Sequence, residues 1–155
     1  MMASNLRAFL AGCAALLVGC SEPPTTVDDL VIQFRLSRTS AHPGDRLEAR
    51  LVVSNPTARS ITLSSGDSCV AGLEVRKDGQ RVALEGTSFA CLTVVSYFEI
   101  APHDSLVRTF PLVAMLQSDR APWGYVVRPP AGVYRVQARM SGGLPDPTAE
   151  LQVVD

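Results

Sequence analysis

The chain has 155 residues, of which 14 are basic and 15 acidic, so its formal net charge at pH 7 is −1. Hydrophobic residues make up 46% of it, which is enough for one domain with a sizeable buried core. A duplex-sized nucleic-acid site needs several clustered Lys or Arg side chains, and no such cluster stands out, so no nucleic-acid partner is expected.

The first residues have the layout of a secretory signal. One positive charge, Arg7, precedes an apolar segment from Ala8 to Val18. This segment ends in Leu17-Val18-Gly19-Cys20, which resembles the lipobox of bacterial lipoproteins. The resemblance implies that residues 1–19 are a signal peptide, that cleavage precedes Cys20, and that lipid is attached to the Cys20 thiol.

Two alternatives to this interpretation are weaker. A second tetrad, Leu10-Ala11-Gly12-Cys13, leaves only Ala8 to Gly12 before its cysteine, which is shorter than the usual apolar core of about 7–15 residues. A helix over residues 8–18 would reach roughly 16 Å, about half of a hydrocarbon core, and would not span a membrane. Several acyl chains on Cys20 would instead hold the protein on the membrane surface.

The residues after Cys20 are polar and contain Pro23-Pro24, without hydrophobic periodicity. We therefore expect residues 20–29 to form the lipidated cysteine and a flexible tether, and residues 30–155 to form one domain. By resemblance to sorting in two-membrane bacteria, Ser21 implies a location in the cell envelope. The expected site is the outer membrane, with the domain facing the periplasm or the cell surface.

After the tether, the hydrophobic pattern takes a period of two, which is typical of strands with one buried face. Ile32 to Leu36 and Leu47 to Val53 alternate in this way, separated by the turn residues His42-Pro43-Gly44-Asp45. Asn55-Pro56-Thr57 ends the second of these strands, and a third begins at Ile61.

A hairpin is predicted at Lys77-Asp78-Gly79-Gln80, because Asp-Gly between two alternating runs is a strong short-range hairpin signal. In this hairpin Leu73 and Val75 are expected to face Val82 and Leu84. Further strands are expected over residues 92–100, 106–112, 133–140 and 151–153.

This pattern predicts an all-β fold, an immunoglobulin-like β-sandwich of about 7–9 antiparallel strands. No segment of the mature chain has the period of a helix. Pro130-Ala131-Gly132-Val133-Tyr134 supports the prediction, because a turn leading into a strand with an early tyrosine is frequent in such domains.

Two of the four cysteines, Cys69 and Cys91, remain once the signal is removed and Cys20 is lipidated. An even pair in an oxidising compartment favours a structural disulfide, which would stabilise the fold by roughly 3 kcal/mol. The alternative is a free, redox-active or metal-binding pair. It has weaker support, because the spacing is not Cys-x-x-Cys and no histidine lies between the two.

The sequence contains no motif that indicates catalysis, a metal or a cofactor. Its two histidines, His42 and His103, both lie beside turn residues. His103-Asp104-Ser105 contains the residue types of a catalytic triad, but adjacent side chains cannot point along one proton-transfer line. Asp67 is interpreted as a backbone cap rather than a calcium ligand. We therefore predict no enzymatic activity, no metal, no cofactor and no small-molecule substrate.

Residues 114–130 are the least strand-like part of the domain. They contain Arg120, the only tryptophan Trp123, and Tyr125. These residue types are enriched at interface hot spots, so the segment is a candidate partner-binding loop. The alternative is that Trp123 folds back over an open end of the sandwich and Arg120 is solvated.

Five pieces of the mature sequence carry a resemblance to a known family: His42 to Asp45, Leu51 to Thr57, Leu73 to Gly79, Ile100 to Pro102 and Pro130 to Tyr134. The pattern, over about residues 30 to 140, resembles the BsuPI-like intracellular proteinase inhibitor family and related Ig-like domains of bacterial surface lipoproteins. The resemblance implies the sandwich fold and, through the family name, a protease partner. The lipobox implies export, which differs from the intracellular location in the family's name. No inhibitory-loop motif is present.

The hypothesis that results is a lipid-anchored Ig-like domain that binds a protein or stabilises an envelope assembly. Its expected partners are the membrane, through lipid on Cys20, and a protein. The alternative is a proteinase inhibitor of the BsuPI-like type that acts at the cell surface.

Overall fold

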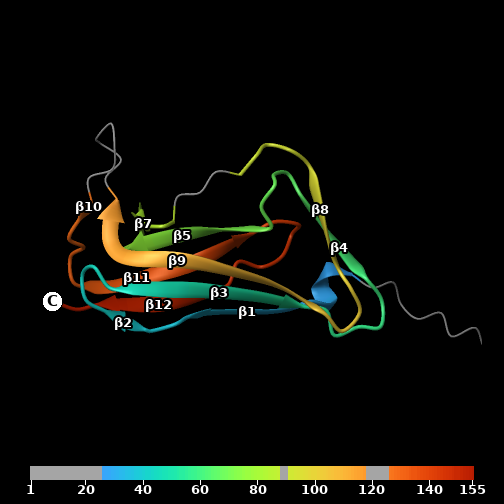
Figure 1. Cartoon of the computed structure of the whole chain (residues 1–155), viewed down its shortest axis with the longest axis horizontal. Coiled ribbons are helices and arrows are strands. Elements are labelled where there is room, and N and C mark those ends of the chain that lie inside the picture. The colour runs from blue at the N-terminus through green and yellow to red at the C-terminus, as the bar shows by residue number, and fades with distance from the viewer. Residues whose placement is uncertain (1–25, 88–90, 118–125) are drawn as a thin grey trace, which may run out of the picture.

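The computed structural model describes residues 26–87, 91–117 and 126–155 (Figure 1). Over these residues the chain is almost entirely β, with twelve strands, nine of which have three or more residues. The predicted all-β sandwich is confirmed. A single 3-10 turn, η1 (Val27–Asp29), precedes the first strand. In chain order the strands are β1 (Val31–Leu36), β2 (Ser40–Ala41), β3 (Arg46–Ser54), β4 (Ile61–Ser65), β5 (Ala71–Lys77), β6 (Gln80–Val82), β7 (Leu84–Glu85), β8 (Ser96–Ile100), β9 (Ser105–Gln117), β10 (Val126–Val127), β11 (Gly132–Met140) and β12 (Thr148–Val153).

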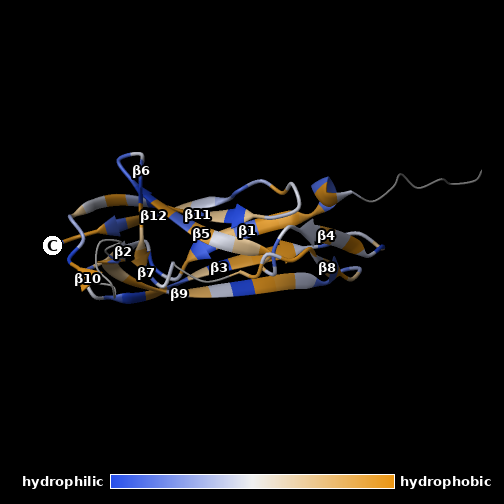
Figure 2. Cartoon of the chain, turned by 90° about the horizontal axis from the view of Figure 1, so that it is seen from above, coloured by the Kyte–Doolittle hydropathy of each residue, from blue (hydrophilic) through white to orange (hydrophobic). Residues whose placement is uncertain are grey.

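Two five-stranded sheets form the body of the sandwich. One has the order β1-β3-β9-β10, with β7 also paired to β9, and the other has the order β2-β12-β11-β5-β6. Figure 2 shows these sheets as two layers seen edge on. β4 and β8 form a separate two-stranded sheet at the end where η1 lies, whereas β2, β10 and the C-terminus lie at the opposite end (Figure 1). We call these the N-terminal end and the C-terminal end of the sandwich.

The core lies between the two layers and follows from the period-two pattern. Ala49, Leu51 and Val53 of β3 are fully buried, and the residues between them are only partly so. On the facing layer Tyr134 and Val136 of β11 are equally buried. Successive side chains of a strand point to opposite faces, so alternation alone assigns one face of each strand to the core.

The predicted turns are present. Residues His42 to Asp45 close a tight turn in which the Asp45 amide donates to the His42 carbonyl at 3.0 Å. In the β5–β6 hairpin Lys77 pairs with Gln80, while Asp78 and Gly79 have φ values of 50° and 79°. Positive φ at both central residues is the geometry that Asp-Gly adopts readily, and it matches the twist of the strands.

Tyr134 confirms the expected sandwich feature at the start of β11. Its Oη donates a hydrogen bond to the carbonyl of Pro130 at 2.8 Å, four residues upstream. This is the tyrosine corner seen in immunoglobulin-like sandwiches.

The connections differ from the sequence prediction in four places. Leu84 does not face Leu73: the hairpin partner β6 ends at Val82, and Leu84 pairs with Leu116 of β9 in the other sheet. The short pair β2–β12 is parallel rather than antiparallel. The strand expected over 92–100 begins only at Ser96, and β9 continues to Gln117, beyond the expected end of its strand.

The first described residues lie within the segment that was expected to be a tether. Val27–Asp29 form η1, in which the Asp29 carboxylate accepts from the Thr26 amide at 2.8 Å. η1 contacts β4, and Leu30 behind it is buried. Residues 27–29 of the expected tether are therefore part of the folded structure.

Candidate functional site

Four of the predicted site residues lie outside the described residues: Cys20, Arg120, Trp123 and Tyr125. The structure describes both ends of the predicted loop, which was expected over residues 114–130. Residues 114–117 belong to β9, and Gln117 pairs with Val126 of β10, so the loop is strand where it adjoins residues 118–125.

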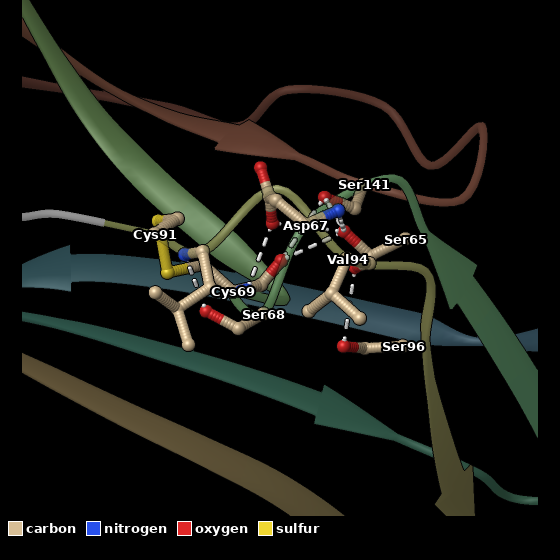
Figure 3. The surroundings of a disulfide bond; sticks show 9 residues. Ser65, Asp67, Ser68, Cys69, Cys91, Val94, Ser96 and Ser141 are labelled. Atoms are coloured by element: carbon tan, nitrogen blue, oxygen red, sulfur yellow. Dashed lines mark hydrogen bonds between the residues drawn. A yellow bond between two sulfur atoms is a disulfide. The ribbon is translucent and has the colours of Figure 1, made fainter.

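Cys69 and Cys91 form the predicted disulfide, with their sulfur atoms 2.07 Å apart and a separation of 22 positions in the chain. The pair joins the segment after β4 to the segment before β8 (Figure 3). The alternative of a free or metal-binding pair is excluded in this structure. Asp67 lies beside the two sulfur atoms, but disulfide sulfurs are not thiolates and are not available as metal ligands.

Asp67 acts as the expected backbone cap. Its Oδ1 accepts from the Cys69 amide at 2.8 Å and from the Ser65 hydroxyl at 3.0 Å (Figure 3). Ser65 is only 4% exposed, and its hydroxyl also lies 3.0 Å from the hydroxyl of Ser141, which is 76 positions later in the chain. The turn that carries Cys69 is therefore held by Asp67 within the turn and by Ser141 from a distant part of the chain.

Asn55 is a buried polar residue whose role sequence reasoning missed. Its side chain is 1% exposed, and its Nδ2 donates to the carbonyls of Arg59, Ile100 and Ala101 at 2.7, 2.9 and 3.1 Å. Its Oδ1 accepts from the amide and the hydroxyl of Thr57. The signal was Asn55-Pro56-Thr57, since an asparagine that starts a turn often bonds the backbone two residues on.

Four side chains near the disulfide form what we call the N-terminal apolar surface: Leu92, Val94, Val95 and Tyr97. Their exposed fractions are 71%, 49%, 63% and 71%. The backbone beneath them is held in place: the Leu92 amide donates to the Ser68 hydroxyl, and the Leu92 carbonyl accepts from the Ser68 amide, both at 2.9 Å. Tyr97 pairs with Ser64 in the β4–β8 sheet. These apolar side chains are thus presented to solvent by a fixed backbone.

A second exposed apolar group lies at the other end and comprises Val126, Val127 and Val133, each 43–49% exposed. We call it the C-terminal surface. It is bordered by charged groups: Arg128 lies 3.5 Å from the Asp155 carboxylate, and Arg135 lies beside Val133 in a shallow hollow of the β11 face. An apolar centre with a charged rim is the usual composition of a protein-binding surface.

His103-Asp104-Ser105 has the residue types of a triad but was not expected to form one, and its side chains make other contacts. The Asp104 carboxylate accepts from the Ser105 amide at 2.7 Å, and the Ser105 hydroxyl lies 2.8 Å from that of Ser54. His42 follows β2 at the C-terminal end, where its Nδ1 lies 3.1 Å from the carbonyl of Asp155, whereas His103 follows β8 at the N-terminal end. The two histidines therefore belong to opposite ends of the molecule.

Two ionisable side chains have shifted pKa values, and both have structural causes. A hydrogen bond from Arg76 Nε, 2.6 Å from Glu74 Oε1, lowers the pKa of the Glu74 carboxyl below its usual 4.5. Burial raises the pKa of Tyr134 above 10, and the charge of Asp78 adds to this effect. Both groups lie on the β5–β11 side of the sandwich and take part in contacts that hold the strands.

A hollow of about 580 Å³ lies between β3, β7 and β9. Its described lining combines Arg46, Glu48 and Glu85 with Leu47, Leu112 and backbone around Gly86. A Cβ at Gly86 would lie 2.3 Å from the carbonyl oxygen of Pro111, so only glycine allows β7 to approach β9 this closely. The described lining of the hollow contains no histidine or cysteine.

No family model matches this chain, and no curated protein matches it. Among solved structures it is similar to a β-glucosidase from Erythrobacter marinus, with 16% identity and a TM-score of 0.50 over 81% of this chain and 15% of that one. It is also similar to a β-glucosidase from Listeria innocua in complex with gluconolactone (11% identity, TM-score 0.47, 81% of this chain and 16% of that one). A third is an alkylpurine DNA glycosylase from Pseudomonas fluorescens bound to DNA containing an abasic site analogue (10% identity, TM-score 0.47, 82% of this chain and 31% of that one).

The chain spans less than a third of each of these neighbours. At 16% identity the likeness to the Erythrobacter marinus protein is one of fold alone. Among the described residues, none of the helical structure is long and apolar enough to cross a bilayer.

Proposed function

We propose that the protein is a lipid-anchored envelope protein whose Ig-like domain is not catalytic and binds a protein through its C-terminal end. The observation that carries the proposal is the opposite placement of two features. The first described residues, which include η1, lie at the N-terminal end, whereas the exposed valines of the C-terminal surface lie at the other end of the sandwich.

This placement suits an anchored binding domain. Lipid on Cys20 would hold the N-terminal end near the membrane, because only six residue steps separate Cys20 from Thr26. The thirteen residues of β9 extend over roughly 40 Å, from the N-terminal end towards the C-terminal end. A sandwich anchored in this way can present its C-terminal surface well away from the bilayer.

The predicted loop fits the same proposal. Residues 118–125 connect β9 to β10, directly beside Val126 and Val127 of the C-terminal surface. Arg120, Trp123 and Tyr125 are therefore the residues that we propose to extend this surface towards a partner. Aromatic and arginine side chains carry much of the energy at protein interfaces.

Cross-linking in the native envelope, followed by mass spectrometry, tests the binding function. We expect one set of partners to be captured by the wild-type chain and lost in Val127→Asp/Val133→Asp and in Trp123→Ala. The matched control is Val107→Asp, which alters an exposed valine of β9 outside the C-terminal surface. Capture of the same partners by all variants would contradict binding through this end.

Cell-surface proteinase inhibition is a second candidate function. The observation in its favour is the stretch from Leu92 to Val95, which is exposed, forms no strand in the structure and is joined at Cys91 to the disulfide. Proteases bind their substrates as extended chain, and a braced exposed segment is a suitable form of such a chain. Incubation with a panel of serine proteases tests this candidate, and the absence of inhibition at micromolar concentration would end it.

A further inference from the structure

The N-terminal apolar surface is not explained by a partner at the C-terminal end. Leu92, Val94, Val95 and Tyr97 account for four of the nine large hydrophobic side chains that are exposed in the described residues, and they lie within six consecutive positions. Two hydrogen bonds join the Leu92 backbone to Ser68, and Tyr97 is paired in β8, so the backbone of this segment is held at both ends. Several exposed apolar side chains close together in the chain, on a fixed backbone, indicate a binding surface.

We propose that this surface contacts the lipid bilayer to which the chain is attached, an inference that rests on the proposed lipidation of Cys20. The occupant follows from the short stretch of chain between Cys20 and the first described residue, Thr26. Six residue steps lead from Cys20 to Thr26, so this segment spans at most roughly 20 Å. The bilayer surface therefore lies within about that distance of η1.

The apolar surface is within reach of the same bilayer. η1 contacts β4, and β4 pairs along its whole length with β8, in which Tyr97 faces Ser64. Neighbouring strands are separated by about 4.8 Å, and the five residues of β8 cover roughly 17 Å. A tether of roughly 20 Å thus allows the bilayer to touch both η1 and β8.

The composition of the segment suits a lipid surface. No charged residue occurs between Glu85 and Glu99, so the segment carries no charge into the headgroup region. Tyrosine is enriched at membrane–water interfaces, because its ring is apolar and its hydroxyl remains hydrated. Tyr97, with its high exposure, is placed to occupy this position.

A weak contact is sufficient here. An attached anchor keeps the apolar surface at a high effective concentration near the lipid, so a contact too weak to recruit a free protein still forms. The contact would set the orientation of the sandwich and direct its C-terminal end away from the bilayer. The C-terminal surface, with its charged rim of Arg128 and Asp155, is the natural comparison in a test.

Tryptophan quenching by brominated lipid tests the proposal on the full mature protein. The chain has one tryptophan, so Trp123→Phe gives a background without any. Tyr97→Trp and Val133→Trp in this background place one probe at each end, and both positions are exposed. Each protein is reconstituted into vesicles of phosphatidylethanolamine and phosphatidylglycerol with or without brominated acyl chains. Intact-mass analysis establishes whether Cys20 is acylated.

We expect brominated lipid to reduce the emission of the Tyr97→Trp protein and to leave that of the Val133→Trp protein unchanged. If Tyr97→Trp alters the unfolding midpoint, Leu92→Trp in the same background replaces it. An acylated, vesicle-bound protein with equal emission in both kinds of vesicle overturns the bilayer contact while the anchor stands. The bilayer contact is also overturned if the emission of the Tyr97→Trp protein changes only when envelope protein is added, or only as the density of the protein itself rises. Either result would mean that a protein, rather than lipid, covers this position. A protein with no acyl chain refutes the anchor instead.

Discussion

The two ends of the sandwich are held in different ways. At the N-terminal end the contacts join segments far apart in the chain: Asn55 bonds Ile100 across 45 residues, and Ser65 bonds Ser141 across 76. At the C-terminal end distant segments are joined by backbone hydrogen bonds, such as Gly44 to Ala114 and Val154 to Ala41, whereas the Tyr134 side chain bonds Pro130 only four residues away. The disulfide belongs to the first group.

The difference has a physical meaning. A substitution removes a contact that a side chain makes, whereas a backbone hydrogen bond remains when the side chain beside it is changed. We therefore expect substitutions at the N-terminal end to cost more free energy of unfolding than substitutions at the C-terminal end. Four changes, in order of decreasing effect, test this expectation.

Asn55→Ala should have the largest effect, a loss of roughly 3–4 kcal/mol in the free energy of unfolding, because it leaves several buried carbonyls without donors. Asn55→Asp should not restore stability, since a carboxylate cannot donate to those carbonyls. Denaturant unfolding followed by circular dichroism measures both variants. Ser54→Ala, at the adjacent and less buried position, is the control, and a cost for Asn55→Ala no greater than for this control would refute the argument.

Removal of the disulfide by Cys69→Ala/Cys91→Ala should cost about 3 kcal/mol, because the unfolded chain regains the freedom of a loop of 22 residues. Reduction of the wild-type protein should lower its unfolding midpoint towards that of the variant. The variant itself should not respond to reductant, which serves as the control. Identical midpoints for oxidised and reduced wild-type protein would show that the bridge does not brace this end.

Tyr134→Phe should cost less, about 1 kcal/mol, since it removes one hydrogen bond to Pro130 and leaves the ring in place. The raised pKa of Tyr134 predicts a pH dependence: its stabilising contribution is complete below pH 10 and is lost as the pH rises above that value. Unfolding measured from neutral to alkaline pH should show a decline that is smaller in Tyr134→Phe. An unchanged alkaline profile would contradict this assignment.

Glu74→Gln should have the smallest effect, roughly 0.3 kcal/mol, because Arg76 is half-exposed and water screens the pair. The lowered pKa of Glu74 means that its contribution is present above pH 4.5 and is lost as the pH falls through the lower folded-state value. The stability of the variant should therefore vary less with pH in the acid range. Thermal unfolding between pH 3 and pH 7 measures the difference, and equal acid profiles would exclude a role for the pair.

Much of the fold was predictable because it depends on local chemistry. The alternation in β3 identified its buried face, and Asp78-Gly79 identified the hairpin with its positive φ values. The cysteine pair was predicted by counting, because the lipobox-like residues Leu17 to Cys20 imply that Cys13 is removed and Cys20 is lipidated. Asp67 was correctly expected to cap backbone amides.

The candidate surfaces were harder to predict. The residues from 92 to 95 have the β-branched composition of a buried strand and were expected to be one, yet Leu92 and Val95 are largely exposed. Composition does not reveal this, because many apolar atoms remain on the surface of every folded protein. The burial of Asn55 was equally hidden, since asparagine is more often exposed than buried.

The sequence by itself determined where most of the longer strands lie, which face of each is apolar and where the tight turns lie, since these depend on neighbours within a few positions. Only the tertiary structure decided that Leu84 crosses to β9, that β2 joins β12 in parallel, and that β4 and β8 form a sheet of their own. A hydrophobic pattern with a period of two indicates that a strand has a buried face, but it does not indicate which strand pairs with it. That choice depends on how distant segments fill one core together.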